Sequence, residues 1–311
     1  MSELLVEAPG FLTTVQDLGR PGYAASGVSA SGAADPVALT IGNRLVGNEA
    51  RAAALEMTIV GGAFRFEDDG VVALTGADPG ARLGDRPAAP WRAVTVRAGE
   101  TLTCTALRGG ARAYLCIRGG ISVPLVLGSA STHLLTALGG FAGRALRAGD
   151  RVPLGTAGTR APVRDPIDPS EIPGYRPGDP FRVTPGPQAS WFDGHATSIL
   201  YDSEWRVAEA CDRMGIRLEG GRIHMIGPRE LVTEGVALGA IQVPPAGAPI
   251  VLFVEHQTTG GYPKIANVIA ADLARLGTLR PRDSLRFAPV SLTEARALLR
   301  AQQEALDARP A

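Results

Sequence analysis

The polar, glycine-rich segment 257–264 carries the residue types best suited to chemistry in this chain. It reads Gln-Thr-Thr-Gly-Gly-Tyr-Pro-Lys, and its Lys264 is the only lysine of the protein. The hydroxyls of Thr258 and Thr259, an ammonium and free backbone N–H groups together suit a negatively charged species. The segment therefore predicts a site for a carboxylate, a carbamate or a phosphorylated intermediate. The alternative is an ordinary turn with a solvated lysine.

The flanks of this segment predict how it is held. An apolar run over 250–255 has strand length, and the apolar residues of 263–276 recur at helical spacing before Gly277. A turn that opens a helix presents unpaired N–H groups and the positive end of the helix dipole to an anion. The spacing GxxxxGK[ST] of a nucleotide-binding loop is absent from the sequence.

A second candidate is the long glycine-rich loop over 13–35, because long unstructured loops are usually functional or disordered. Its polar groups are Gln16, Asp17, Arg20, Ser29 and Ser31. Asp17 and Arg20 have the simpler alternative of pairing with each other. Asp35, just before Pro36, is better explained as the N-cap of a helix that ends at Gly47-Asn48.

A third candidate is Arg213 in the sequence Asp212-Arg213-Met214-Gly215, where an arginine beside a glycine can clamp a carboxylate. An ordinary turn explains the same pattern. His256 adjoins segment 257–264 and is a candidate base, although a single histidine at a strand end is more often structural. No histidine has metal-ligand spacing, so no metal site is predicted.

Apolar residues alternate with period two over 55–120, which predicts strands separated by glycine turns. A short turn of the type Arg-Ala-Gly-Glu recurs before four predicted strands, at 97–100, 147–150, 176–179 and 280–283. A final helix begins at the capping box Ser291-x-x-Glu294. The sequence predicts a mainly β protein with few helices, in domains 1–158 and 188–311 joined by a proline-rich linker over 159–187.

Composition excludes several classes of protein. The chain has 31 basic and 31 acidic residues, which argues against a nucleic-acid partner or a polybasic membrane surface. Three cysteines without CxxC spacing argue against a disulfide framework and a zinc site. The first residues lack a signal-peptide pattern, and apolar runs are strand-sized. We expect a cytoplasmic protein.

Several motifs together resemble one known family. The chain is similar to the family of 5-oxoprolinase C subunits and KipA, which includes the allophanate-hydrolase-subunit-2-like region of urea carboxylase and is often labelled biotin-dependent carboxyltransferase. The resemblance covers about residues 3–300 and is carried by segments 13–20, 26–28, 31–33, 119–121, 213–215, 239–244 and 257–264.

The resemblance implies two cyclophilin-like β-barrel domains and a multi-chain enzyme. The implied partners are a KipI-like B subunit and an A subunit of the LamB/YcsF type. The implied reaction opens the lactam of 5-oxoproline to L-glutamate with ATP and Mg²⁺. Two alternatives remain within the family: the carboxyltransferase component of a urea carboxylase-like enzyme, or a KipA-like regulator that captures a kinase inhibitor. An Ala-Met-Lys-Met sequence is absent, so biotin would have to arrive on another chain.

Residue pattern and resemblance together give a predicted site. Its catalytic residues are Lys264, Thr258 and Thr259. Its substrate-binding residues are Gln16, Asp17, Arg20, Ser31, Arg213, Gln257, Gly260, Gly261 and Tyr262. The sequence departs from the family pattern at Asp212, which would weaken anion binding by Arg213 if the two side chains paired, and again at Glu255 and His256.

Overall fold

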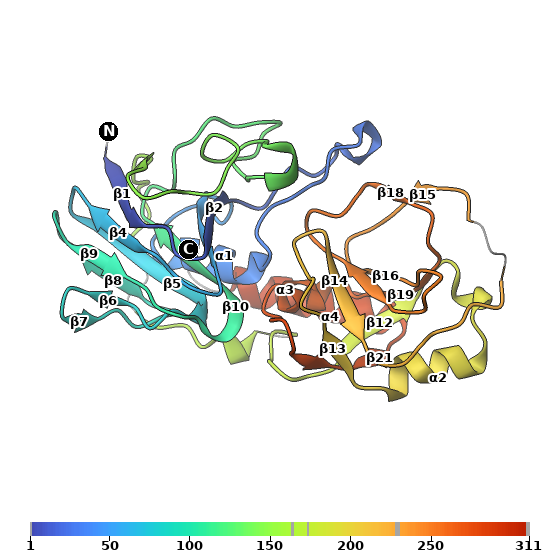
Figure 1. Cartoon of the computed structure of the whole chain (residues 1–311). Helices are drawn as coiled ribbons and strands as arrows, with labels where there is room; N and C mark the ends of the chain where they lie inside the picture. The colour runs from blue at the N-terminus through green and yellow to red at the C-terminus, as the bar shows by residue number, and fades with distance from the viewer. Residues whose placement is uncertain (1, 163–164, 173, 228–230, 309–311) are drawn as a thin grey trace. The chain divides into compact units, whose positions relative to one another are not determined.

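The structure, a computed structural model, describes residues 2–162, 165–172, 174–227 and 231–308, and the chain forms two compact units (Figure 1). Unit 1 holds the described residues of 1–20, 31–169 and 307–311, and unit 2 those of 21–30 and 170–306. The change between 169 and 170 falls within the predicted linker 159–187. Residues 21–30 belong to unit 2, whereas the sequence predicts them in the N-terminal domain.

Unit 1 is built from two antiparallel sheets. The six-stranded sheet has the order β11 (Arg151–Pro153), β1 (Glu3–Ala8), β4 (Ala63–Phe66), β9 (Thr101–Thr103), β6 (Arg82–Leu83) and β7 (Arg86–Pro87). The five-stranded sheet has the order β2 (Leu12–Gln16), β3 (Ala54–Thr58), β10 (Arg108–Ile117), β5 (Gly70–Asp78) and β8 (Ala93–Val96). The strands expected over 55–120 are thereby confirmed.

One face of the five-stranded sheet belongs to the core of unit 1. Val15, Leu55, Leu115 and Leu74 lie opposite one another across β2, β3, β10 and β5. All four are buried in one hydrophobic cluster with residues of the six-stranded sheet such as Phe64. Because side chains alternate along a strand, the residues one position away in each strand face the other way.

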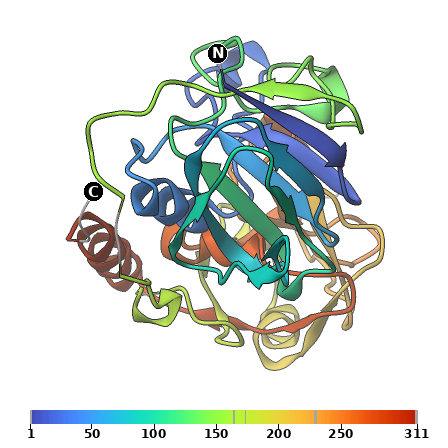
Figure 2. The ribbon, with the colours of Figure 1, turned by 90° about the vertical axis from the view of Figure 1, so that its left-hand side faces the viewer.

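Helix α1 (Pro36–Leu45) packs against β5 and β10 of this sheet (Figure 2). Asp35 is its N-cap, and its carboxylate accepts a hydrogen bond of 2.9 Å from the N–H of Ala38, as the sequence predicts. Gly42 allows the close approach, since a Cβ there would lie 2.6 Å from the sulfur of Cys116.

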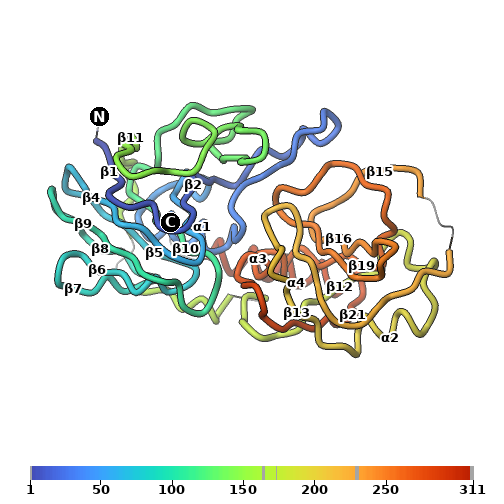
Figure 3. The backbone as a smooth tube through the Cα atoms, in the orientation of Figure 1, coloured from blue at the N-terminus to red at the C-terminus, as the bar shows by residue number. Residues whose placement is uncertain are grey.

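Unit 2 contains one strongly curved eight-stranded sheet, traced in Figure 3. Its order is β20 (Ser284–Leu285), β13 (Trp205–Val207), β14 (Gly215–Glu219), β17 (Ile250–Leu252), β16 (Ala240–Gln242), β19 (Lys264–Val268), β12 (Phe181–Pro185) and β21 (Phe287–Pro289). The two edge strands, β20 and β21, are separated by Arg286 alone, so the sheet must curl until its edges nearly meet. The predicted mainly β, barrel-type fold is confirmed.

Short elements complete the chain. The helices of unit 2 are α2 (Gly194–Asp202), α3 (Leu273–Leu276) and α4 (Leu292–Asp307), and a small sheet pairs β15 (Glu234–Gly235) with β18 (Thr259–Gly260). The 3₁₀ turns are η1 (Ala24–Ser26), η2 (Leu134–Thr136), η3 (Pro169–Glu171), η4 (Ala189–Trp191) and η5 (Ala270–Asp272). Ser291 caps α4 as predicted, with its hydroxyl 3.1 Å from the N–H of Glu294. None of the helices in the described part of the chain combines the length and apolarity that crossing a membrane requires.

The recurring turn is a real structural device at three of its four positions. The acidic side chain at its end accepts a hydrogen bond from the backbone N–H three residues earlier. The three bonds are Arg97 to Glu100 (2.8 Å), Arg147 to Asp150 (2.7 Å) and Arg280 to Asp283 (2.8 Å). Each closes a turn from which a strand starts.

One predicted element is wrong. The helix expected over 263–276 is strand β19, followed by the short η5 and α3. Pairing of β19 with β16 and β12 satisfies its backbone on both sides, and this tertiary pairing overrides the helical spacing of its apolar residues. Strand β12 confirms the strand expected after the turn at 176–179, and it lies inside the proline-rich segment 159–187. The neighbouring prolines, Pro180 and Pro185, stand at its ends, where they are tolerated.

Candidate functional site

Segment 257–264 does not open a helix, so the predicted contribution of a helix dipole is wrong. Thr259 and Gly260 form β18, which pairs with Gly235 and Glu234 of β15. Gln257, Thr259, Gly261 and Tyr262 are exposed and Thr258 is half-buried. Lys264 is the exception, since it lies in β19 and only 2% of it is exposed.

Lys264 is held by polar groups from two distant segments. Its Nζ lies 2.5 Å from Oε1 of Glu234, and Nε2 of Gln188 donates to the same oxygen at 2.7 Å. Gln188 also accepts a hydrogen bond from the backbone N–H of Lys264 at 3.1 Å. The hydrogen bond from Lys264, followed by that from Gln188, lowers the pKa of the Glu234 carboxyl below its usual range.

Two glutamines extend this polar group in unit 2. Gln242 of β16 stands directly opposite Lys264 in the strand register, so the two side chains share one face of the sheet. Gln257 donates to Oε1 of Gln242 at 3.5 Å. Gly260 fits against them, because a Cβ at this position would lie 2.8 Å from Nε2 of Gln242. We call Gln188, Glu234, Gln242, Gln257 and Lys264 the lysine cluster.

In unit 1, Asp17 fastens the early loop to the segment 126–132. Its carboxylate accepts hydrogen bonds from the hydroxyls of Ser129 (2.6 Å) and Ser131 (2.5 Å) and from the backbone N–H groups of Gly19 (2.8 Å) and Ala130 (2.7 Å). Arg20 donates to the carbonyls of Ser131 and Val126. These bonds give Asp17 and Arg20 a role in shaping the loop.

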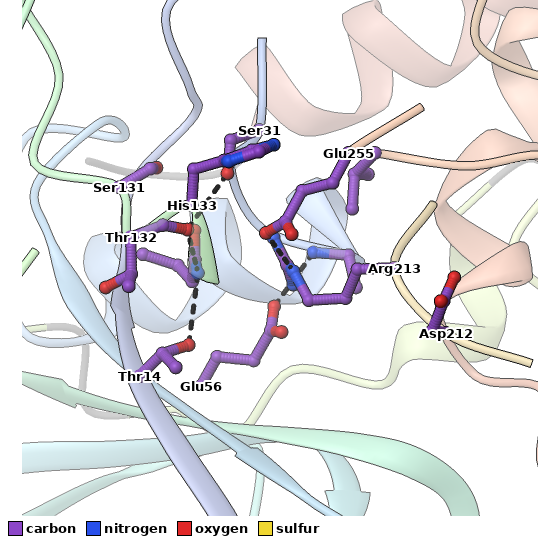
Figure 4. Close-up of polar contacts among 12 residues, drawn as sticks. Thr14, Ser31, Glu56, Ser131, Thr132, His133, Asp212, Arg213 and Glu255 are labelled. Carbon is purple, nitrogen blue, oxygen red and sulfur yellow. Dashed lines mark hydrogen bonds and ion pairs between the residues drawn. The ribbon is translucent and has the colours of Figure 1, made fainter. Parts of the chain in front are cut away.

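Gln16 and Ser31 both donate to the carbonyl of Thr132, at 3.0 Å each. Figure 4 shows the bond between Ser31 and Thr132. Nε2 of Gln16 also donates to the hydroxyl of Thr14 at 3.0 Å. Oε1 of Gln16 is buried without a hydrogen-bond partner among the described residues. The predicted residues Gln16, Asp17, Arg20 and Ser31 thus all form hydrogen bonds with the segment 126–132 of unit 1.

A buried acid that the sequence analysis missed lies next to these residues in the sheet. Glu56 stands opposite Thr14 in β2 and opposite Tyr114 in β10. Its Oε2 accepts hydrogen bonds from the hydroxyl of Tyr114 (2.6 Å) and from the N–H of Ala34 (2.8 Å). Burial, followed by the charge of Glu56, raises the pKa of Tyr114 well above its ordinary value.

Arg213 is paired, but not with its neighbour Asp212. Its Nε donates to Oε1 of Glu255 at 2.5 Å, and both residues are almost fully buried. Figure 4 shows this ion pair, with the side chain of Asp212 turned away from it. Asp212 instead accepts hydrogen bonds from the N–H groups of Met214 (2.8 Å) and Gly215 (3.1 Å). The expectation that Asp212 would weaken Arg213 is therefore corrected, because Glu255 neutralises it.

His256 has the features of a structural histidine. Its Nδ1 lies 2.6 Å from the carbonyl of Gln257, which requires a proton on that nitrogen. Burial lowers the pKa of its imidazole below the ordinary value. Among the described residues there is no group of three or more His, Cys, Asp or Glu side chains placed to hold a metal ion.

Some of the functional residues that the sequence did not predict still have a recognisable local pattern, and others have none. Glu56 and Gln242 are polar residues inside apolar strands, which is a signal for a buried polar contact. Glu234 and Gln188 gave no local signal, since they contact Lys264 from 30 and 76 residues away in the sequence.

Fold and sequence together define a member of a known family: the chain belongs to the family of the carboxyltransferase domain, subdomains A and B, whose model matches residues 26–289. It is 42% identical to the C subunit of 5-oxoprolinase from Escherichia coli over 95% of this chain and 93% of that protein. It is 39% identical to the corresponding C subunit from Haemophilus influenzae over 94% of this chain and 93% of that protein. The structure of Kluyveromyces lactis urea carboxylase matches with a TM-score of 0.90 at 31% identity, over 98% of this chain and 29% of that one.

Proposed function

We propose that this chain is the C subunit of a multi-chain 5-oxoprolinase, which opens the lactam of 5-oxoproline to L-glutamate with ATP. One observation carries the proposal: the similarity to the C subunit of the Escherichia coli 5-oxoprolinase extends over nearly the whole of both chains, at 42% identity. The partners we propose are a KipI-like B subunit and an A subunit of the LamB/YcsF type. We propose the cytoplasm as the location of this complex.

The reaction needs a step that activates a stable amide. In our proposal the carbonyl oxygen of the lactam takes the γ-phosphoryl group of Mg²⁺-bound ATP and ADP leaves. Water then adds to the activated carbon, the ring C–N bond breaks, and a second water releases phosphate. We assign ATP and Mg²⁺ to the complex as a whole. Donors fixed in a protein lower the energy of such anionic species because they need not reorganise.

The residues of this chain that suit the anion are in the lysine cluster. Lys264 is buried and charged, and Gln242 and Gln257 add amide donors beside it. We propose that Lys264, Thr258 and Thr259 act on the substrate and that Gly260 allows close approach. Arg213 is assigned a positioning role, since its charge is already neutralised by Glu255.

A carboxyltransferase is the second candidate, and the match to urea carboxylase at a TM-score of 0.90 favours it. Such an enzyme would move CO₂ from carboxybiotin on another chain to a nitrogen of the substrate. It would depend on bicarbonate and a biotinylated carrier, and 5-oxoproline would have no effect.

Co-expression with the two proposed partner chains tests the function. We expect the purified complex to release glutamate from 5-oxoproline and to hydrolyse ATP only when 5-oxoproline is present. Dependence on a biotinylated carrier would establish the carboxyltransferase instead. Tight capture of a kinase inhibitor without turnover would establish a KipA-like regulator.

A further inference from the structure

We propose that Glu234 is a built-in carboxylate that occupies the anion site of Lys264 and is displaced by the carboxylate of the substrate. The proposal rests on the proposed function only for the identity of that substrate, 5-oxoproline. It assigns Glu234 a competitive role that makes the site accessible only to a ligand with its own carboxylate.

The two partners of this ion pair are buried to very different extents. The side chain of Lys264 is 3% exposed, whereas that of Glu234 is 42% exposed. A buried ammonium needs an anionic partner, because an unpaired charge away from water is strongly unfavourable. A half-exposed carboxylate has no such need. Glu234 therefore neutralises the buried charge of Lys264, and its own carboxylate loses little free energy when it leaves Lys264 and is solvated by water.

Buried donors in the lysine cluster are incompletely paired. Nε2 of Gln242 is buried and lacks a hydrogen-bond acceptor among the described residues. Nζ of Lys264 contacts one oxygen of Glu234, and that oxygen also accepts from Gln188. Buried donors are normally paired. A carboxylate with two oxygens, placed between Lys264 and Gln242, would satisfy the donors that Glu234 leaves unpaired.

The element that carries Glu234 is weakly held. Strand β15 has two residues and pairs only with the two residues of β18 among the described strands. The N–H of Val236 adds one bond of 3.1 Å to the carbonyl of Thr258. Val232, just before this strand, is 88% exposed. Few buried apolar contacts mean that such a segment opens at low free-energy cost, so Glu234 can move away without disturbing the barrel.

Binding of two related ligands to the full chain tests the proposal by calorimetry. 5-Oxoproline carries the lactam and a carboxylate, whereas 2-pyrrolidinone carries the lactam alone. Glu234→Gln keeps the shape of the side chain and removes its charge. We expect it to bind 5-oxoproline about tenfold more tightly than the wild type, with no gain for 2-pyrrolidinone. Adding Lys264→Met to Glu234→Gln should abolish the gain.

Glu209→Gln is the matched control, because Glu209 is an exposed carboxylate 2.5 Å from Nε of Arg282 in the same unit. We expect its affinity for 5-oxoproline to equal that of the wild type. An equal or weaker affinity in Glu234→Gln, or an equal gain for 2-pyrrolidinone, would overturn the proposal.

Carboxyl NMR of the wild-type protein gives a second test, which does not depend on whether any variant folds. Saturating 5-oxoproline should raise the pKa of Glu234 toward its ordinary value, because Lys264 then contacts the ligand. An unchanged pKa at saturation contradicts displacement. Acetate, which carries a carboxylate but no lactam, distinguishes failure of this inference from failure of the proposed function. If Glu234→Gln binds acetate more tightly but the complex releases no glutamate, the carboxylate site is supported and the 5-oxoprolinase function is rejected. If the complex releases glutamate but Glu234→Gln binds acetate no more tightly than the wild type, the function is supported and the displacement of Glu234 is rejected.

Discussion

Arg213 and Glu255 form a buried ion pair, with 2.5 Å between Nε and Oε1, at a position where the sequence suggests Asp212 as the partner. The backbone reinforces the contact, since the N–H of Glu255 donates to the carbonyl of Arg213 at 2.7 Å. The pair joins the turn before β14 to the end of the segment that follows β17. This neutral pair is the basis of the positioning role that we propose for Arg213.

Removal of Glu255 should therefore be costly. Glu255→Ala takes the carboxylate of Glu255 away from the buried guanidinium of Arg213, and we expect the free energy of unfolding to fall by about 3–5 kcal/mol. Urea denaturation of the full chain measures this. Asp212→Asn is the control, because an amide oxygen still accepts the two backbone bonds; a change of less than about 0.5 kcal/mol is expected. Equal effects of the two variants would contradict the assignment.

Lys264→Met should strongly reduce activity and spare the fold. The methionine fills the buried space, and Glu234 is exposed enough to be solvated when its partner is lost. We expect turnover of 5-oxoproline by the assembled complex to fall about 10²–10³-fold, with complex formation unchanged in gel filtration. Wild-type turnover would remove Lys264 from the catalytic site.

The titration of Glu234 gives a pH prediction with a definite sign. Its pKa in the folded protein is lowered below the ordinary glutamate value, first by Lys264 and then by Gln188. The ion pair therefore contributes stability above the unfolded pKa, and the contribution is lost as pH falls through the lower folded pKa. Carboxyl NMR should show a midpoint below that of an unperturbed glutamate, and Lys264→Met should move it upward. A midpoint unaffected by that substitution would contradict the contact.

Asp17→Asn should loosen the segment 126–132. Three of the four hydrogen bonds end on Oδ1 of Asp17 and the one from the N–H of Ala130 ends on Oδ2. An asparagine that keeps the first three must therefore point its NH₂ group at the buried N–H of Ala130, which loses its acceptor. We expect a loss of about 2–3 kcal/mol and faster hydrogen exchange confined to this segment and the early loop. Asp193→Asn, at the N-cap of α2, is the control, since asparagine caps equally well. Unchanged exchange in 126–132 would remove Asp17 from its proposed role.

Local sequence signals were sufficient for part of this protein. Asp35 at the N-cap and Gly47 after α1 mark the two ends of that helix in the sequence, because capping depends on adjacent residues. Alternation of apolar residues located β4, β5 and β10 in the same way. The recurring acid-closed turn depends on residues three apart, as at Arg97 and Glu100, so it too was visible in the sequence.

Tertiary structure decided the remainder, because the decisive partners are far apart in the chain. Apolar residues after Pro263 fit a helix locally, but pairing with β16 and β12 makes them a strand. The sequence alone determined that Lys264 is the chain's one lysine, beside glycines and hydroxyls. Only the folded barrel brought Glu234 and Gln188 to it, because burial of an ammonium requires partners and nothing in the local sequence says where they come from.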